Sequence, residues 1–399
     1  MQAVILAGGK GARLGALAGG RPKPLVEVGG KPYVLYLIEN LRRFGFGEIV
    51  ILAGPFSDAY RESLGGAAIR GIKLTIVAED PPADTAGALR YAAEHLRPRF
   101  LLLNGDSYFD FNWLDLVARH DTGRWLARIA LRRVDDVGRY GAVTLAGTRV
   151  MNFTEKDATG PGLINAGLYW MKRAILDEIG PPPLSLERTL LPNLAARGLL
   201  RGAVYDGRFI DIGVPDDLAQ GTRLMPLWQR RPAVFLDRDG VINRDTGYIH
   251  RKEDFIWCDG AQDAIKRLNE SGYFVFVVTN QAGIARGLYR PADVVRLHRW
   301  INRELRRVGA HIDEFYFCPH HPTEGSGRYR QICECRKPAP GMLRQAMSEW
   351  PVDRSASLMI GDKETDMAAA SAAGVEGVLL RDGDNVDTVV ANRLKPDLS

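Results

Sequence analysis

The sequence lacks long hydrophobic runs, is poor in cysteine and has no concentrated basic segment. No apolar stretch approaches the about 18 residues of a membrane-spanning helix. The chain has only four cysteines in 399 residues, too few for a disulfide framework. Its 53 basic residues are nearly balanced by 48 acidic ones, and no basic run is interleaved with aromatic side chains. These absences argue against a membrane span, a disulfide-stabilised secreted domain and a nucleic-acid partner.

The composition that remains is that of a folded enzyme. Hydrophobic residues make up 46% and charged residues 25% of the chain, without a low-complexity tract. A chain of 399 residues is too long for one typical hydrophobic core, so two domains are the simplest expectation. Residues 2–6 enter a strand pattern at once, without a signal-peptide pattern, which predicts a cytoplasmic protein. The net charge of +5 gives weak support to small anionic substrates.

A short apolar run past the middle of the chain ends in two aspartates. Residues 234–236 are typical of a buried central strand, and Asp237-Arg238-Asp239-Gly240 follows directly. Side chains alternate between the faces of a strand, so Asp237 and Asp239 can point to the same side. The carboxyl end of such a strand is where ligands bind in open α/β sheets. The pair therefore predicts a shared metal ion or phosphoryl group, with a solvated surface turn as the alternative.

A glycine-rich loop follows the first predicted strand. Residues 3–7 are apolar, and Gly8-Gly9-Lys10-Gly11-Ala12-Arg13 comes next. Such a loop lets backbone N–H groups approach phosphates, but its spacing is not that of a Walker loop or a dinucleotide-binding fold. Together with Pro22-Lys23-Pro24-Leu25 downstream, the arrangement resembles the signature of the sugar-nucleotide pyrophosphorylases, a family of nucleotidyltransferases. The resemblance extends over most of residues 1–228.

This resemblance implies a site where a sugar 1-phosphate attacks the α-phosphorus of a nucleoside triphosphate and expels pyrophosphate. It implies Asp106 and Asp211 as ligands of Mg²⁺, and Arg13 and Lys23 as the cations that neutralise charge on the reacting phosphates. The residues that it implies as nucleotide and sugar-phosphate contacts are Gly8, Gly9, Gly11, Glu79, Thr85, Gly87, Lys156 and Asn165. Each residue alone could also have a structural role, for example in a turn at Asn104-Gly105.

Three further motifs follow the aspartate pair in the C-terminal half. They are Val277-Val278-Thr279-Asn280-Gln281, Arg336-Lys337-Pro338 and Gly361-Asp362-Lys363-Glu364-Thr365-Asp366. With the aspartate pair they resemble, in type and order, the four motifs of the haloacid-dehalogenase-type phosphatases. The resemblance implies that all four meet at one edge of a sheet.

The phosphatase resemblance implies catalysis through an aspartyl-phosphate, formed when the carboxylate of Asp237 attacks phosphorus. Asp239 would protonate the leaving alcohol and then take a proton from water. Asp237, Asp362 and the backbone carbonyl of Asp239 would bind Mg²⁺, while Thr279 and Lys337 hold the phosphoryl oxygens.

Cysteine and histidine form a compact pattern, Cys318-Pro319-His320-His321 followed by Cys333-Glu334-Cys335. Cys318, His320, Cys333 and Cys335 would make a closed Cys₃His set, which suits a structural zinc ion because it leaves no open position. His321 is the rival for the histidine ligand. We prefer His320 because the phosphatase families that this pattern resembles use Cys-x-His.

Two phosphatase families share this zinc pattern, the heptose bisphosphate phosphatases and the histidinol-phosphate phosphatases. The segment Gly247-Tyr248-Ile249-His250 resembles the first of them. The resemblance implies that Asn280, Arg336 and the loop around residues 248–250 contact the substrate.

The sequence thus predicts a two-domain α/β protein. Residues 1–228 are expected to form a Rossmann-like (GT-A-like) nucleotidyltransferase domain, and residues 229–399 a haloacid-dehalogenase-like α/β domain with a zinc loop.

The two resemblances together imply a bifunctional enzyme that removes the 7-phosphate of a heptose 1,7-bisphosphate and then transfers a nucleotide to the heptose 1-phosphate. GTP is the implied nucleotide, because the resembling heptose 1-phosphate enzymes are guanylyltransferases that use the α-anomer. The expected partners are these small molecules, not nucleic acid or a membrane; the expected cofactors are Mg²⁺ and structural Zn²⁺, and the oligomeric state is left open. Two alternatives remain: a hexose 1-phosphate transferase joined to a phosphatase of other specificity, such as for histidinol phosphate, and a phosphatase with a non-catalytic domain that senses sugar nucleotides.

Overall fold

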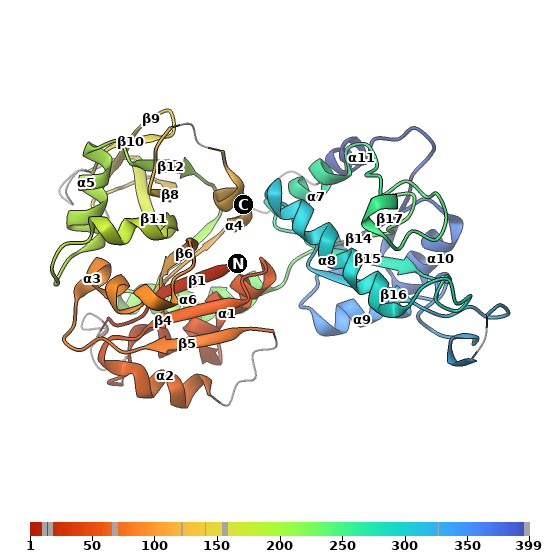
Figure 1. The fold of residues 1–399 in the computed structure, drawn as a ribbon, viewed down its shortest axis with the longest axis horizontal. Helices are drawn as coiled ribbons and strands as arrows, with labels where there is room; N and C mark the ends of the chain where they lie inside the picture. The colour runs from red at the N-terminus through yellow and green to blue at the C-terminus, as the bar shows by residue number, and fades with distance from the viewer. Residues whose placement is uncertain are drawn as a thin grey trace. The chain divides into compact units, whose positions relative to one another are not determined.

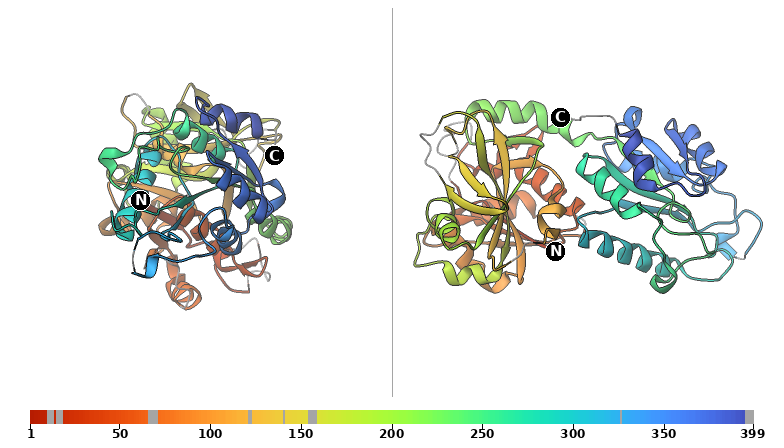
Figure 2. Two further views of the ribbon diagram at one scale, coloured as in Figure 1. Left: turned by 90° about the vertical axis from the view of Figure 1, so that its right-hand side faces the viewer. Right: turned by 90° about the horizontal axis from the view of Figure 1, so that it is seen from above.

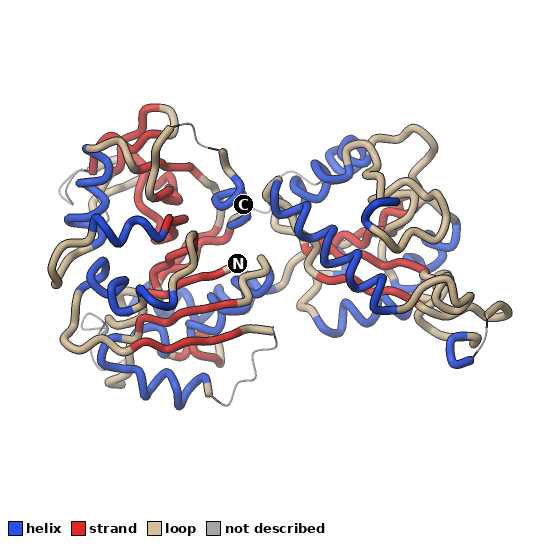
Figure 3. The backbone as a smooth tube through the Cα atoms, viewed as in Figure 1, coloured by secondary structure: helices blue, strands red, loops and turns tan. Residues whose placement is uncertain are grey.

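The computed structural model describes residues 1–9, 14, 19–65, 71–120, 123–139, 141–153, 159–325 and 327–394. The chain divides into two compact units, Met1–Leu227 and Trp228–Ser399 (Figure 1). In each unit the strands form an inner layer and the helices lie mainly outside it (Figure 3). Among the described residues, no helix is both long enough and apolar enough to cross a membrane.

A mixed sheet is the centre of the N-terminal unit, and in the described part of the chain it has nine strands. In spatial order they are β5 (Lys73–Val77), β4 (Glu48–Leu52), β1 (Gln2–Leu6), β6 (Arg99–Asn104), β11 (Gly162–Lys172), β8 (Ala127–Val134), β12 (Leu200–Val204), β10 (Arg149–Phe153) and β9 (Val143–Ala146). The first four run parallel, whereas β11 runs antiparallel to both β6 and β8. β1 and β6 are mostly buried apolar runs, as expected of strands covered on both faces.

Helices and two short ladders complete this unit. The helices are α1 (Tyr33–Arg43), α2 (Ser57–Leu64), α3 (Asp84–Tyr91), α4 (Trp113–Ala118), α5 (Leu191–Ala196) and α6 (Pro215–Gln229). One core packs α3 and α5 against the large sheet. The first ladder pairs β2 (Glu27–Val28) with β3 (Lys31–Pro32), and the second pairs β7 (Ser107–Asp110) with β13 (Arg208–Asp211). The second ladder joins segments far apart in the sequence and sets Asp211 opposite Ser107.

A parallel sheet is the centre of the C-terminal unit, with five strands among the described residues. Their order is β16 (Glu314–Cys318), β15 (Phe274–Asn280), β14 (Ala233–Leu236), β17 (Leu358–Gly361) and β18 (Glu376–Leu379). The helices are α7 (Ala261–Glu270), α8 (Pro291–Arg307), α9 (Gly341–Glu349), α10 (Glu364–Ala373) and α11 (Val386–Arg393). They lie on both faces of the sheet (Figure 2).

The central strand β14 is buried on both sides because its residues alternate between two cores. Val234 and Leu236 pack with α7, α8 and α11, whereas Ala233 and Phe235 pack with α9 and α10. The predicted strand at residues 234–236 and the α/β class are thus confirmed. The chain leaves this rigid strand at Asp237, so the aspartate pair starts from a fixed position.

Candidate active sites and metal centre

Asp106 and Asp211, the predicted magnesium ligands of the N-terminal unit, come together through the β7–β13 ladder. Asp106 lies between β6 and β7, Asp211 ends β13, and Ile212 N donates to Asp106 O at 2.9 Å. Lys23 reaches the same place, with its Nζ 3.0 Å from Asp106 Oδ2. The structure therefore assembles three of the predicted residues at one point.

Burial and like charge act on this carboxylate pair. Burial raises the pKa of Asp211 to about 6, the neighbouring Asp106 acts in the same direction, and Lys23 acts against both. Burial and the negative charges of the two carboxylates raise the pKa of the nearby Tyr33 hydroxyl. This hydroxyl has no hydrogen-bond partner among the described residues. Two close carboxylates beside one lysine are a donor set that fits a hard cation such as Mg²⁺.

The raised pKa of Asp211 leads to a pH-dependent prediction for the metal-free protein. A carboxyl group whose pKa is raised by folding binds its proton more tightly in the folded state, so its ionisation costs stability as the pH rises from about 4 to about 6. Asp211→Asn removes this cost. In calorimetric scans with EDTA, the N-terminal unit of the variant should unfold a few degrees above the wild type at pH 7.5, and the gap should be clearly smaller at pH 4.5. An equal gap at both pH values would contradict the assignment.

Gly8 and Glu79 lie against each other beyond the end of β1. A Cβ on Gly8 would come within 3.1 Å of the Gly54 backbone and 3.4 Å of Glu79 Oε1, so a larger residue would force a shift. Gly54 N donates to Glu79 Oε1 at 3.1 Å, and burial raises the pKa of Glu79. Gly9 beside them is exposed. Contact of these residues with a nucleotide stays a prediction.

Thr85 and Gly87 lie on α3 and make packing contacts. Thr85 Oγ1 accepts a hydrogen bond from Leu186 N at 2.8 Å. A Cβ on the buried Gly87 would lie 3.2 Å from Pro182 Cβ. These contacts explain on structural grounds why a threonine and a glycine occupy these positions. The predicted substrate contacts of the two residues stay untested.

Asn165 belongs to a polar cluster that includes a residue no motif marks. Its Nδ2 donates to Tyr169 OH at 2.8 Å, and Glu187 Oε1 lies 3.3 Å from Tyr169 OH and 3.4 Å from Asn165 Nδ2. Only the fold brings Glu187 to β11, and a lone acid in an ordinary helical segment gives no sequence signal. The other predicted residues of this unit, Gly11, Arg13 and Lys156, lie outside the described residues.

In the C-terminal unit, the predicted catalytic residues come from the carboxyl ends of adjacent strands. Asp237 follows β14, Thr279 lies near the end of β15, and Asp362 follows β17. β14 pairs with both β15 and β17, which puts these side chains at one edge of the sheet. The expected convergence of the motifs is therefore present in the fold.

Lys337 is the buried counter-charge of Asp237. Its Nζ lies 2.9 Å from Asp237 Oδ1 and 2.7 Å from Asp366 Oδ1, and it donates to Val278 O at 2.8 Å. Two carboxylate oxygens and one carbonyl oxygen of the protein thus surround the ammonium, and contact with a phosphoryl oxygen stays a prediction. Asp366 had no predicted role, although its position one helical turn after Asp362 was an available signal.

Asp237, Asp362 and Asp366 form a group whose ligand oxygens all lie within 4.8 Å of one another. Asp362 Oδ1 is buried without a hydrogen-bond partner among the described residues. Burial raises the pKa of Asp237 to about 6, against the effect of Lys337, and burial also raises the pKa of Asp362. Buried carboxylates with an unshared oxygen fit a hard cation such as Mg²⁺.

The carboxylate of Asp239 lies outside that group and is surrounded by hydrogen-bond donors. Arg238 Nη2 donates to both of its oxygens, at 3.0 and 2.9 Å, and Asn243 Nδ2 donates to Oδ1 at 3.0 Å. Gln281 Nε2 donates to Oδ2 at 3.0 Å. Among the described residues, the group that could hold a metal ion does not include the Asp239 side chain, so the expectation that the two carboxylates share one metal ion is not met. The metal contact implied for the backbone carbonyl of Asp239 stays a prediction.

Asn280 and Arg336 position the segment that carries Lys337. Asn280 Nδ2 donates to Lys337 O at 3.0 Å, and Lys337 N donates to Asn280 Oδ1 at 3.1 Å. Arg336 Nη1 donates to His320 O at 3.1 Å. The amide of Asn280 is thus engaged at both ends, and the predicted substrate contacts of the two residues stay untested.

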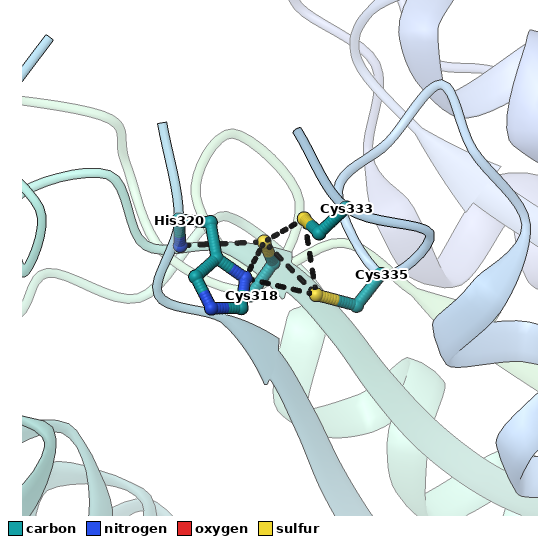
Figure 4. Close-up of side chains that lie close together, drawn as sticks. All are labelled: Cys318, His320, Cys333 and Cys335. Carbon is teal, nitrogen blue, oxygen red and sulfur yellow. Dashed lines mark hydrogen bonds between the residues drawn. The ribbon is translucent and has the colours of Figure 1, made fainter. Parts of the chain in front are cut away.

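Four side chains converge in the loops around the end of β16: Cys318, His320, Cys333 and Cys335 (Figure 4). The Sγ atom of Cys318 lies 3.3 Å from that of Cys335 and 3.6 Å from that of Cys333, and His320 Nδ1 lies 3.4 Å from Cys335 Sγ. A tetrahedral zinc ion with bonds of about 2.3 Å holds its sulfur ligands about 3.8 Å apart. The four side chains therefore fit one zinc ion with no open position.

His321, the rival ligand, has a different role. Its Nδ1 accepts a hydrogen bond from Glu324 N at 2.9 Å and fixes the turn that follows. The structure places His320, not His321, among the possible ligands. Because Cys335 lies two residues before Lys337, the cluster also anchors the segment that carries this lysine.

Loss of the cluster should loosen that segment. We expect Cys333→Ser to lower the zinc content, measured by mass spectrometry of the purified protein, from about one ion per chain to well below one. Hydrogen exchange between residues 318 and 337 should rise at the same time, because the loop loses its cross-link. Cys258→Ser, outside the cluster, is the matched control and should keep its zinc. Full zinc content in Cys333→Ser would contradict the assignment.

Comparison with known proteins gives a family for each unit. Residues 2–226 match the family model described as nucleotidyl transferase, and residues 334–398 match one described as HAD-hydrolase-like. A D-glycero-β-D-manno-heptose-1,7-bisphosphate 7-phosphatase of Rhodopseudomonas palustris is 48% identical over 161 residues, which are 40% of this chain and 89% of the relative. The Yersinia pestis protein of the same name is 47% identical over 156 residues, 39% of this chain and 83% of the relative.

A solved structure is similar to the N-terminal unit. HddC from Yersinia pseudotuberculosis, complexed with GMP-PN, is 30% identical with a TM-score of 0.51, and the match covers 56% of this chain and 99% of HddC. Together with the family models, this match confirms the predicted fold class, a nucleotidyltransferase fold followed by a haloacid-dehalogenase-like fold.

Proposed function

The chain belongs to the nucleotidyl transferase family and carries a phosphatase unit, and from this premise we propose a bifunctional enzyme of heptose activation. The C-terminal unit removes the 7-phosphate of D-glycero-D-manno-heptose 1,7-bisphosphate. The N-terminal unit then transfers a nucleotide to the heptose 1-phosphate and releases pyrophosphate. The observation that carries the proposal is the presence, in one chain, of a unit similar to heptose bisphosphate 7-phosphatases and a unit similar to HddC.

In the phosphatase reaction, a carboxylate oxygen of Asp237 attacks phosphorus and the bond to the sugar oxygen breaks. Asp239 gives its proton to that oxygen, which leaves as the sugar hydroxyl. Water then attacks the aspartyl-phosphate, gives a proton to Asp239, and releases phosphate and free Asp237. Lys337, 2.9 Å from Asp237, offsets the charge of the nucleophile. Mg²⁺ held by Asp237 and Asp362 would supply positive charge to the phosphoryl oxygens.

In the nucleotidyl transfer reaction, no covalent enzyme intermediate is needed. An oxygen of the sugar 1-phosphate attacks the α-phosphorus of the triphosphate and pyrophosphate leaves in line. Lys23, next to Asp106, offsets charge on the reacting phosphates. Asp106 and Asp211 are the residues that would hold Mg²⁺ here, and Arg13 and Lys156 are proposed as further phosphate contacts.

GTP is the proposed nucleotide donor, and a guanine nucleotide analogue accompanies HddC in its solved structure. The anomer is a separate question. The phosphatase relatives carry the β-anomer in their names, whereas the resemblance of the N-terminal unit implies the α-anomer. We propose that both units of this chain use the same anomer, since the product of the first reaction is the substrate of the second.

A substrate comparison tests the phosphatase half. The wild-type enzyme with Mg²⁺ is assayed for phosphate release from the α- and β-anomers of heptose 1,7-bisphosphate, from a hexose 1,6-bisphosphate and from histidinol phosphate. We expect one heptose anomer to have a kcat/KM at least about tenfold above every other compound. A preference for histidinol phosphate would overturn the proposed substrate.

A further inference from the structure

Gln281 is the last residue of the motif Val277-Val278-Thr279-Asn280-Gln281, and its side chain is buried between two groups proposed to act in the phosphatase reaction. Its Nε2 donates to Asp239 Oδ2 at 3.0 Å and to Thr279 Oγ1 at 2.9 Å, and the residue is only 2% exposed. One amide nitrogen thus contacts both the proposed proton shuttle and the hydroxyl proposed to hold the phosphoryl group.

The orientation of this amide is fixed by Tyr289. Tyr289 OH lies 2.7 Å from Gln281 Oε1, and burial raises the pKa of Tyr289 to about 12, so the phenol keeps its proton and donates it. Because Oε1 accepts this bond, both hydrogens on Nε2 are available for Asp239 and Thr279.

The Tyr289 ring is itself held in place from two sides. It packs over Gly283, where a Cβ would lie 2.3 Å from Tyr289 Cε1, and it stacks on His250 with 4.7 Å between the ring centres. The Tyr289 hydroxyl is therefore fixed in position. If the Gln281 amide were rotated by 180°, its Nε2 would face this hydroxyl and the hydrogen bonds to Asp239 and Thr279 would be lost.

The hydroxyl of Thr279 has one proton and must direct it away from Gln281, because Gln281 already donates to its oxygen. No other partner of Thr279 Oγ1 is found in the part of the chain that the structure describes. This proton is therefore free for an oxygen atom of a phosphoryl group placed beside Asp237.

We infer that Gln281 is a positioning residue of the phosphatase reaction: it aims the Thr279 hydroxyl at the phosphoryl group and holds the Asp239 carboxylate for proton transfer. The inference rests on the proposed phosphatase function. The alternative is that Gln281 only ties β15 to its neighbour. Its backbone N donates to Cys318 O at 2.8 Å, and that bond is kept when the side chain changes.

Gln281→Met tests the inference because methionine keeps the length of the side chain and removes its donors. With heptose 1,7-bisphosphate we expect kcat to fall about 30- to 100-fold while KM changes less than about threefold, since the lost interactions act in the transition state. The leaving group of p-nitrophenyl phosphate needs little protonation. With this substrate the fall in kcat of Gln281→Met should be at least about threefold smaller, because proton donation by Asp239 no longer contributes to the rate.

A double-mutant cycle tests the link to Thr279. In the Thr279→Val background, the further loss caused by Gln281→Met should be at least about threefold smaller than in the wild type. Gln345→Met, which replaces an exposed glutamine on α9, is the matched control, and melting temperatures identify general destabilisation.

The outcomes are distinct. An unchanged rate of Gln281→Met would overturn the inference. So would equal rate losses with both substrates, if the loss in the double variant equals the product of the two single losses. Gln281 would then have only a structural role. A wild type that cleaves p-nitrophenyl phosphate but not heptose 1,7-bisphosphate would overturn the proposed substrate, and the cycle on the aryl phosphate would still decide the role of Gln281. A wild type that cleaves neither would overturn both proposals.

Discussion

Replacing Asp237 by asparagine is expected to lower phosphatase activity by about 10⁴-fold or more while nucleotidyl transfer continues at the wild-type rate. An amide of the same size cannot attack phosphorus, and the two reactions are assigned to separate units. Phosphate release and pyrophosphate release, measured on the same preparation, give the two activities. The matched control is Asp387→Asn, which makes the same change in a surface ion pair with Arg267 in the same unit.

Asp237→Asn also tests whether the charge of Asp237 is balanced as the structure indicates. The substitution leaves Lys337 paired with Asp366, so the variant should stay folded. A variant that keeps more than about a tenth of the wild-type phosphatase rate would exclude Asp237 as the nucleophile. Loss of both activities at once would point to unfolding and would be visible in its melting curve.

Replacing Asp106 by alanine should have the reverse effect. We expect nucleotidyl transfer to fall by about 10³-fold, because the loss of a ligand weakens the binding of a magnesium ion that is worth several kcal/mol of charge stabilisation. Phosphatase activity should stay unchanged. The substitution also removes the ion pair of Lys23, which adds to the loss. Asp58→Ala is the matched control, since Asp58 is almost fully exposed in a surface pair.

The Asp106→Ala experiment also separates a catalytic from a sensing N-terminal unit. If the wild type and Asp106→Ala form sugar nucleotide equally slowly from every triphosphate, the N-terminal unit is a sensor and its transferase assignment is wrong. A large difference between the two proteins with one triphosphate supports the catalytic assignment and identifies the base.

Sequence pattern was sufficient where a strand leads directly to a motif. The apolar run at residues 234–236 predicted β14, and the parallel pairing of β14 with β15 and β17 then brings Asp237, Thr279 and Asp362 to one edge. Local spacing likewise predicted that the three cysteines cluster with a histidine, because the four residues come from two short segments. The family resemblance, not the spacing, favoured His320 over His321.

Sequence pattern did not predict the site residues whose partners are set by tertiary contacts. Glu187 meets Asn165 only because its segment packs on β11, and Asp366 meets Lys337 only because α10 starts beside the segment that carries this lysine. The donors around Asp239 come from three places in the chain. Apart from Asp366, whose spacing from Asp362 was a usable signal, these residues give no clue by their type, since each type is common on a solvated surface.

The central claim is that one chain carries out two consecutive reactions on one sugar. The most direct measurement is to incubate the wild-type protein with heptose 1,7-bisphosphate, GTP and Mg²⁺ in one tube and to follow all products by mass spectrometry. The account predicts phosphate, pyrophosphate and GDP-heptose, with heptose 1-phosphate as a transient species. Heptose bisphosphate that remains intact, or heptose 1-phosphate that accumulates with GTP and with every other triphosphate, would contradict it.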